Sequence, residues 1–361
     1  MGISKYFALV PVVFALGSPA VAAPEPGAVK VVIVNAIENF IRPSFHQFAI
    51  EAEALKGDVA GLCAAPSETA LEESREQFKA AVTAFSRIEF VRIGPLTVGD
   101  RMERLLLWPD RKGIALKQVQ QALATKDATA AKAETLQGKS VAMQGLTALE
   151  YVLFGTDAEQ LAGADGAYRC SYGEAITTLM AGLAETIDAE WADPSGISER
   201  LINPKPDAAD FRTETEVLEK LAATLVFGTE TIRDQRIKPI LGASGGAPKP
   251  KSALFWRSDM TVPALVANFA GLRDFFNESK FTEAVGYADS WIAAGAKVQF
   301  ASAAKDGAAV TDPIDVAVGD AAQLSALQGL VTVTTELDAL VGVGLSEALG
   351  LSVGFSSLDG D

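Results

Sequence analysis

The segment Val141–Gly155 (VAMQGLTALEYVLFG) constrains the fold of this chain more than any other. Between Val141 and Phe154 the only formally charged residue is Glu150, and the other residues are apolar or small and neutral. A run of this length with so little polarity predicts a helix in the hydrophobic core. A lone carboxylate is costly to bury unless it has a partner. Glu150 is therefore expected either to lie at a polar edge or to have a site arranged around it.

Apolar residues also recur at intervals of three and four along most of the chain, which is typical of helices with one buried face. In the first such stretch, residues 35–61, Pro43 predicts a kink or a late helix start. Ser67 is predicted to cap the next helix. Sustained strand-like alternation is missing, apart from a valine-rich fragment near 310–318. The predicted fold class is all-α, with helices over residues 35–61, 67–89, 114–124, 141–155, 170–191, 211–241, 262–276, 282–300 and 321–343.

The distribution of turn residues predicts two helical-bundle-like halves packed together. At 361 residues the chain is long enough for one large domain or two ordinary ones. The stretch 193–210 holds three prolines and a glycine and is the candidate boundary. We therefore expect an N-terminal half over about 28–192 and a C-terminal half over about 211–345. Residues 242–251 and 301–313 are predicted to be loops.

The net charge limits the kinds of molecule that the protein is expected to bind. The formal net charge is −15, and 49 % of the residues are hydrophobic, as in a globular protein. A strongly acidic chain is a poor partner for nucleic acid or for an anionic membrane surface. Cationic ligands and metal ions are compatible with this charge.

The N-terminus resembles a secretory signal peptide, residues 1–22. Lys5 supplies the positive charge, Tyr6–Leu16 forms a short apolar region, and Ala20-Val21-Ala22 fits a cleavage site. The mature protein, 23–361, contains no later apolar run of membrane-spanning length without a break. We therefore predict a protein that is exported to the periplasm and is not inserted in the membrane after signal removal.

The chain has two cysteines and one histidine. In an oxidising compartment the pair Cys63 and Cys170 favours a disulfide, or plain burial. A thiolate metal site is the alternative, although two cysteines without a nearby histidine are a poor zinc set. A single histidine, His46, argues against most metallohydrolase and Ser-His-Asp schemes, which need histidine as ligand or base.

The most informative polar residues are Thr147 and Glu150, which lie three positions apart and so share one helical face. Glu89 and Asp110 are candidates to approach them, as are Arg101 and Arg104. A carboxylate buried among apolar side chains suits a hard-cation site with oxygen ligands. It also suits a structural Glu–Arg pair, and the sequence leaves both interpretations open.

Five segments together resemble the imelysin-like family. Residues 145–155 (GLTALEYVLFG) are similar to the family signature, GxHxxE followed by an apolar run and glycine. The resemblance extends in order and spacing to 63–66 (CAAP), 93–95 (IGP), 107–110 (LWPD) and 267–273 (ANFAGLR). It covers nearly all of the mature chain, and the LWPD and GLTALEYVLFG segments are its most specific parts.

This resemblance implies an exported all-α protein of two bundle-like halves, with a site near their interface. The family is associated with bacterial iron uptake and carries a peptidase label. In this chain Thr147 occupies the histidine position of the motif, and threonine is a poor metal ligand and cannot act as a base near neutral pH. Glu150 remains the candidate ligand for iron or another divalent cation. The candidate ligand-binding residues are Glu150, Thr147, Gly145, Glu89, Trp108, Asp110 and Arg101.

Three functional hypotheses follow. The first is a non-enzymatic binding or accessory component of iron acquisition, whose partner is an iron-related ligand or an envelope iron-uptake component. The second is a metal-dependent peptidase, which rests on the family label alone. The third is a protein-interaction module without a ligand. The missing motif histidine favours the first.

Overall fold

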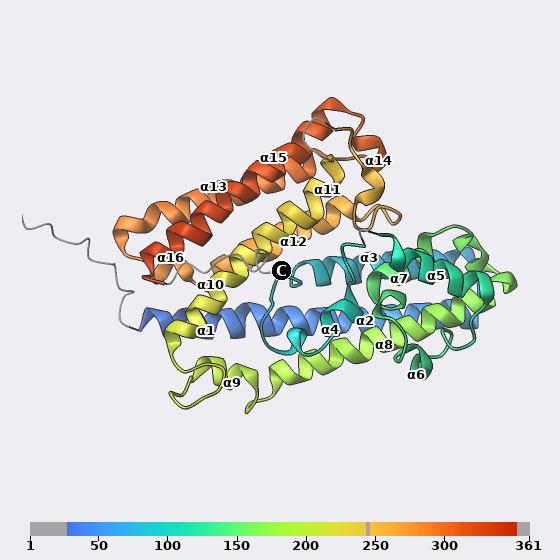
Figure 1. Cartoon of the computed structure of the whole chain (residues 1–361), viewed down its shortest axis with the longest axis horizontal. Coiled ribbons are helices and arrows are strands. Elements are labelled where there is room, and N and C mark those ends of the chain that lie inside the picture. Colours follow the sequence, from blue (N-terminus) through green and yellow to red (C-terminus); the bar gives the residue numbers. More distant parts are fainter. Residues whose placement is uncertain (1–26, 111, 243–245, 352–361) are drawn as a thin grey trace, which may run out of the picture.

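The computed structural model describes residues 27–110, 112–242 and 246–351. Every regular element within these residues is helical and none is a strand, which confirms the all-α prediction. Most long helices run along the longest axis of the molecule (Figure 1). The predicted signal peptide, residues 1–22, lies outside the described residues.

The described chain opens with one continuous helical rod. It consists of α1 (Ala28–Asn35), a π-helical segment (Ala36–Ile41) and α2 (Arg42–Ala64), so the helix begins before the predicted residue 35. Helix α2 follows the π segment directly, and Pro43 is its second residue. Proline lacks the N–H of the helical ladder, and a π turn is a local widening of that ladder. The helix therefore continues through the proline by changing its local winding.

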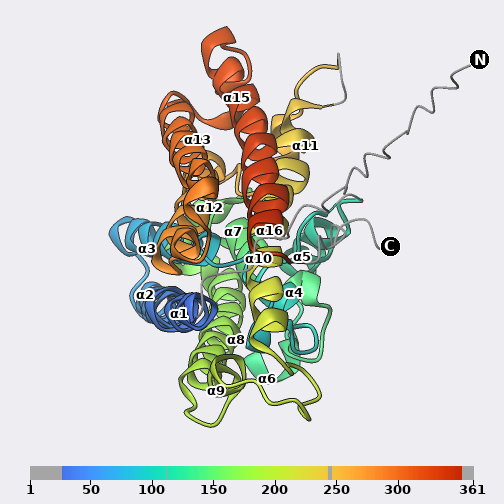
Figure 2. The ribbon, with the colours of Figure 1, turned by 90° about the vertical axis from the view of Figure 1, so that its left-hand side faces the viewer.

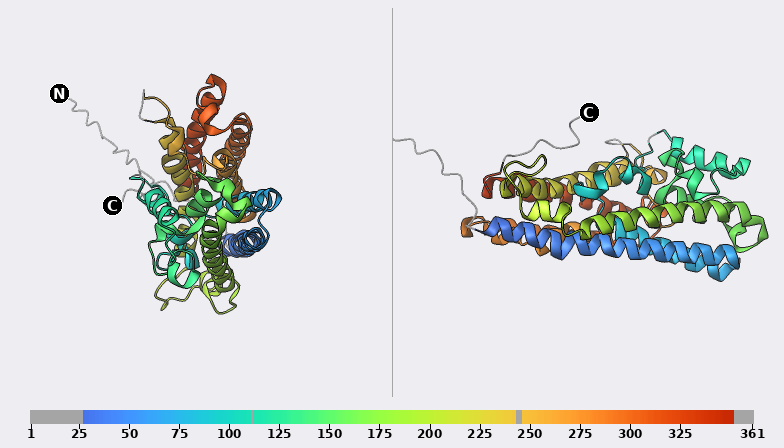
Figure 3. Two further views of the ribbon diagram at one scale, coloured as in Figure 1. Left: turned by 90° about the vertical axis from the view of Figure 1, so that its right-hand side faces the viewer. Right: turned by 90° about the horizontal axis from the view of Figure 1, so that it is seen from below.

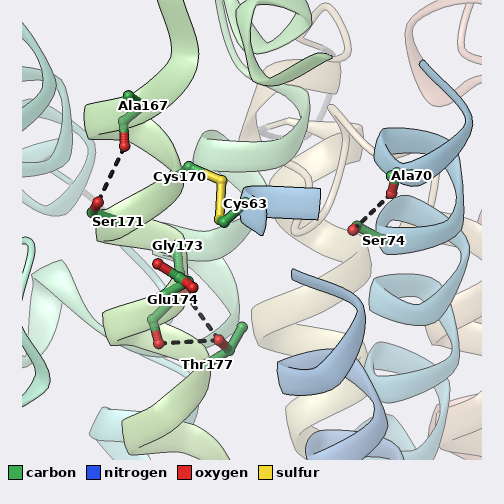
Figure 4. Close-up of a disulfide and its surroundings, with 9 residues drawn as sticks. All are labelled: Cys63, Ala70, Ser74, Ala167, Cys170, Ser171, Gly173, Glu174 and Thr177. Carbon is green, nitrogen blue, oxygen red and sulfur yellow. Dashed lines mark hydrogen bonds between the residues drawn. A yellow bond between two sulfur atoms is a disulfide. The ribbon is translucent and has the colours of Figure 1, made fainter. Parts of the chain in front are cut away.

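Helix α8 (Ala167–Ala192) packs along this rod in the opposite direction (Figure 3, right). At one end a disulfide joins Cys63, near the end of α2, to Cys170, in the first turn of α8 (Figure 4). At the other end His46 Nδ1 lies 2.9 Å from an oxygen of Asp188. The disulfide therefore locks two antiparallel helices at one end of the N-terminal half.

Removing this cross-link is expected to lower the free energy of unfolding by about 2–4 kcal/mol, because the disulfide restricts the unfolded chain. The bridge joins cysteines that are 107 residues apart, and long loops gain most in the chain-entropy account. Urea denaturation of the oxidised wild type and of the Cys63→Ala/Cys170→Ala variant measures the difference. Reduced wild type is the control and should match the variant. Equal stability of variant and oxidised wild type would contradict the expectation.

The other elements of the N-terminal half are one long helix and several short ones. Ser67 caps α3 as predicted, since its hydroxyl accepts a hydrogen bond from the N–H of Ala70 at 3.2 Å. The core helix predicted over 141–155 is present as α7 but begins at Gly145, after a separate 3₁₀ turn at Val141–Met143. All residues of α7 except Thr147 and Phe154 are buried. The bounds are α3 (Glu68–Ser86), α4 (Arg101–Leu105), α5 (Ile114–Thr125), α6 (Ala133–Leu136) and α7 (Gly145–Phe154), and α9 (Ile197–Ile202) lies within the predicted boundary segment 193–210.

The C-terminal helices gather on one side of this half (Figures 1 and 2). They are α10 (Glu214–Glu230), α11 (Lys238–Leu241), α12 (Thr261–Glu278), α13 (Ser290–Ala308), α14 (Ile314–Ala317), α15 (Ala321–Leu337) and α16 (Leu345–Ala348). A second π segment, Thr231–Ile237, joins α10 to α11 and again precedes a proline, Pro239.

Apolar side chains from both halves form one continuous core. Helix α12 packs on α3, and α10 packs on α1. At this interface the ring of Phe275 lies 5.3 Å from that of Phe40 and 5.8 Å from that of Phe90, centroid to centroid. The boundary at 193–210 stays a prediction, and separating the halves there would expose these aromatic faces to water.

Helix α13 differs from the prediction. It was expected over 282–300 with a loop over 301–313, but it begins at Ser290 after two short 3₁₀ turns and continues to Ala308. Its last turns are rich in alanine, which has the highest helix propensity, and Ala303 is buried against the core. The valine-rich fragment near 310–318 contains the short helix α14 in place of a strand.

One helix in the described residues is long and apolar enough to cross a membrane. It spans Ala321–Ala348 through α15, a π segment and α16, whereas the sequence had suggested no unbroken run of that length. Leu327, Leu330 and Leu337 on this helix are fully buried within the protein core. Core helices of water-soluble proteins meet the same length and hydropathy criteria, so the helix is weak evidence for a membrane span.

Candidate functional site

Glu150 of α7 is held by a turn from the C-terminal half. The residue is 4 % exposed, and its Oε1 accepts three hydrogen bonds. The donors are the backbone N–H of Arg257 (3.0 Å), the backbone N–H of Ser258 (3.1 Å) and the hydroxyl of Ser258 (2.9 Å). The buried carboxyl group therefore has partners from the opposite half of the molecule, and it does not lie at a polar edge.

Two residues in the left-handed region shape this turn. Phe255 has φ of 58° and Asp259 has φ of 57°, and the carbonyl of Phe255 accepts a hydrogen bond from Met260 N–H at 3.0 Å. The ring of Phe255 is buried edge-on against Phe78 of α3. Consecutive backbone N–H groups that converge on one oxygen form an anion-binding concavity, and here the acceptor is Glu150.

Burial raises the pKa of Glu150 above its ordinary value, because the charged form loses its solvation by water. Hydrogen bonds from Ser258 and the nearby positive charge of Arg257 act in the opposite direction, but burial is the larger effect. The neutral acid is therefore favoured over a wider pH range than in an exposed glutamate.

Thr147 lies one turn before Glu150 and lines the same cavity. Its Oγ1 is buried and has no hydrogen-bond partner in the described part of the chain. Buried hydroxyl groups are nearly always paired, with protein or with water. Since no described side chain satisfies Thr147, its partner is expected to come from the cavity.

The cavity has a volume of about 510 Å³, within the range of about 300–1,000 Å³ that is common for small-molecule sites. Its walls come from α7 and α5, from residues 107–110, from the end of the second π segment with α11, and from residues 249–257. These elements belong to both halves, so the cavity lies where the halves meet.

Two other predicted residues, Trp108 and Asp110, also line the cavity. The indole N–H of Trp108 donates to the carbonyl of Gln235 at 3.1 Å, which fixes the ring against the C-terminal half. The carboxylate of Asp110 accepts from the N–H groups of Ile114 (2.8 Å) and Leu116 (3.2 Å). Asp110 is thus engaged at the start of α5.

Glu89 and Arg101 do not line the cavity. Glu89 is buried and accepts hydrogen bonds from Arg236 (2.6 Å) and Asn268 (2.8 Å). Arg101 forms two hydrogen bonds with Glu190 of α8, at 2.7 and 2.8 Å. The first interaction links the two halves, and the second ties α4 to α8.

Gly145 also lies outside the cavity walls, and the packing of α7 explains why it is glycine. Its φ is 70°, a region that favours glycine. A Cβ at this position would lie 2.4 Å from the carbonyl oxygens of both Arg104 and Leu105. Gly145 is therefore required by the close approach of α7 to α4.

The sequence prediction missed the residues that complete the cavity from the C-terminal half. Lys249 and Lys251 fall at the end of the segment that was predicted to be a loop, and Trp256 and Arg257 follow it. The local signal is the run of tryptophan, arginine and serine at 256–258 just before a helix. Its link to Glu150 is invisible in sequence because the two segments are far apart in the chain.

The family model described as imelysin, peptidase M75, matches residues 41–341. The chain belongs to the imelysin family. The match includes α7 and the 249–257 segment, so both sides of the cavity fall within the part that is shared with other imelysins.

Two crystal structures share the fold. An imelysin-like protein from Psychrobacter arcticum 273-4 aligns with a TM-score of 0.76 at 22 % identity, covering 92 % of this chain and 100 % of that one. A candidate iron-regulated protein A precursor from Parabacteroides distasonis ATCC 8503 aligns with a TM-score of 0.72 at 14 % identity, covering 91 % and 97 %. No curated protein sequence matches the chain significantly.

The residues around Glu150 in this imelysin do not fit a directly coordinated metal ion. Within the described residues there is no group of three or more histidine, cysteine, aspartate or glutamate side chains that could hold one. Hard cations need several oxygen ligands, whereas Oε1 of Glu150 faces three hydrogen-bond donors. Metal ligation by Glu150 stays a prediction that lacks companion ligands.

Proposed function

We propose that this imelysin is an exported, non-enzymatic binding component of iron acquisition, and that its ligand occupies the cavity beside Glu150. The observation that carries the proposal is the orphaned hydroxyl of Thr147, which is buried at the wall of a ligand-sized cavity. Family membership and the iron-regulated neighbour support the iron-related role.

The chemistry of the site favours binding over catalysis. A peptidase needs a group that activates water or a nucleophile. Thr147 cannot accept a proton near neutral pH, and the hydrogen bonds to Glu150 come from backbone and hydroxyl donors. The single histidine, His46, lies exposed beside Asp188 and does not line the cavity.

Export to the periplasm is proposed on two supports. The first is the signal-peptide pattern at residues 1–22. The second is the disulfide between Cys63 and Cys170, because disulfides persist in oxidising compartments. An envelope iron-uptake component is the protein partner that this location would provide.

Isothermal titration of the mature protein with ferric citrate and ferric salicylate tests the binding role. Wild type should bind at least one of them, and Thr147→Val should bind on the order of tenfold more weakly, because it removes the cavity-facing hydroxyl without changing the shape of the side chain. Thr177→Val is the matched control, since Thr177 bonds within α8 and lies outside the cavity.

The same protein should not cleave peptides with or without added zinc or magnesium ions. Metal-dependent peptide cleavage that is lost in Glu150→Gln would overturn the non-enzymatic role. If wild type and Thr147→Val bind each ferric complex with the same affinity, the ligand does not bind in the cavity beside Thr147.

A further inference from the structure

The wall of the cavity contributed by the C-terminal half combines aromatic rings with positive charges. Trp256 and Arg257 line it together with Lys249 and Lys251, and Trp108 and Tyr151 face it from the N-terminal half. This concentration of positive charge stands out in a chain with a net charge of −15. The cavity is therefore a basic and aromatic region of an acidic protein.

Arg257 is positioned by aromatic rings. Its guanidinium carbon lies 4.5 Å from the ring centroid of Trp256 and 5.3 Å from that of Tyr151. Its backbone N–H is used by Glu150, but its guanidinium has no ion pair or hydrogen bond with any described residue. A guanidinium that is held by rings and keeps its donors free is suited to bind a carboxylate or another planar anion.

The two lysines of the same wall also lack carboxylate partners in the part of the chain that the structure describes. Lys251 lies over the ring of Trp256, with its Nζ 5.5 Å from the centroid. Two further acidic residues of the cavity already have other partners. Asp110 accepts backbone hydrogen bonds at the start of α5, and Asp234 pairs with Arg233 and Lys238.

Glu150 does not cancel this positive charge at close range. It forms no ion pair with Arg257 within 4.0 Å among the described contacts, its Oε1 already accepts three hydrogen bonds, and burial raises its pKa above the ordinary glutamate value. The free positive charge at the cavity wall is therefore available to a ligand.

We propose that the cavity binds an aromatic anion, that is, an aromatic ring carrying carboxylate or phenolate oxygens. The rings of Trp256, Trp108 and Tyr151 provide stacking surfaces, and Arg257 with Lys251 and Lys249 provides the charge for the oxygens. This inference rests on the proposed function and names its ligand class. Iron would then enter the cavity within a complex of such oxygens and would need no coordination by the protein.

Isothermal titration of the mature protein with three iron-free probes tests the ligand class. Salicylate carries a ring and two oxygen substituents, cyclohexanecarboxylate carries the charge without the aromatic ring, and benzylamine carries the ring with the opposite charge. Salicylate should bind at least tenfold more tightly than either of the others. Tighter binding of benzylamine or equal binding of cyclohexanecarboxylate would overturn the inference.

Two variants locate the binding. Arg257→Gln should weaken salicylate binding on the order of tenfold, because it removes a charged, ring-held donor. Lys251→Gln changes an exposed residue, so it should fold normally and weaken binding several-fold. Lys297→Gln makes the same charge change at an exposed position of α13 outside the cavity and should bind as wild type does. Unchanged affinity in both cavity variants would contradict the proposal.

Ferric salicylate and ferric citrate separate this inference from the proposed function. Preference for ferric salicylate supports both. Binding of ferric citrate without any binding of salicylate or its complex would retain the iron-related role and overturn the aromatic class. Binding of free salicylate without either ferric complex would retain the ligand class and overturn the iron-related role.

Discussion

Replacing Glu89 with alanine is expected to lower the free energy of unfolding by about 3–5 kcal/mol. Glu89 and Arg236 form a buried ion pair, with side chains only 3 % and 4 % exposed. Removing the carboxylate leaves the guanidinium of Arg236 buried without its counter-charge and leaves Asn268 without one acceptor. Urea denaturation of wild type and variant, followed by circular dichroism, measures the loss.

A double-mutant cycle gives the prediction its control. Arg236→Met alone should also be destabilising, because it leaves the Glu89 carboxylate buried without its counter-charge. The double variant Glu89→Leu/Arg236→Met should lose much less than the sum, since apolar replacement of a whole buried pair is often close to neutral. Additive losses in the double variant would show that the two residues do not act as a pair.

The burial of side chains could be predicted from the sequence where it depends on the spacing of apolar residues along one helix. The apolar recurrence over residues 35–61 predicted a helix with one buried face, and Phe45 and Phe48 on that helix are fully buried. The helix predicted over 67–89 ends at Ser86, so Glu89 lies in the turn after α3, where it is buried. The partner of Glu89 was not predictable, because Arg236 is 147 residues away in the chain and helical spacing carries no information on such pairings.

The same limit applies to the candidate site. The apolar run around α7 singled out Glu150 but left open whether it lies at a polar edge or within a site, because its hydrogen-bond donors come from a turn 107 and 108 residues later. That turn requires left-handed backbone at Phe255 and Asp259. A glycine at these positions would have suggested such a conformation, but phenylalanine and aspartate do not. The C-terminal wall of the cavity, residues 249–257, therefore could not be predicted, because sequence patterns show no helix or motif that links this segment to Glu150.

Substituting Glu150 is the second change with a large expected effect. Glu150→Ala should lower the free energy of unfolding by about 3–5 kcal/mol, because it leaves the N–H groups of Arg257 and Ser258 without their acceptor in a buried turn. Glu150→Gln keeps an oxygen at the same place and should cost about 1 kcal/mol or less. Urea denaturation near neutral pH compares both variants with wild type.

The pH dependence of these stabilities tests the direction in which the pKa of Glu150 is shifted. Because burial raises the folded-state pKa of Glu150, the native protein binds more protons than the unfolded chain between the ordinary glutamate value and the raised one. The stability of wild type relative to Glu150→Gln should therefore fall as pH rises through that window. If the stability of wild type relative to Glu150→Gln instead rises with pH, the hydrogen-bond donors of Ser258 and Arg257 affect the pKa of Glu150 more than burial does. Glu150 would then be an anion beside Arg257, and the cavity would lose much of its preference for a negatively charged ligand.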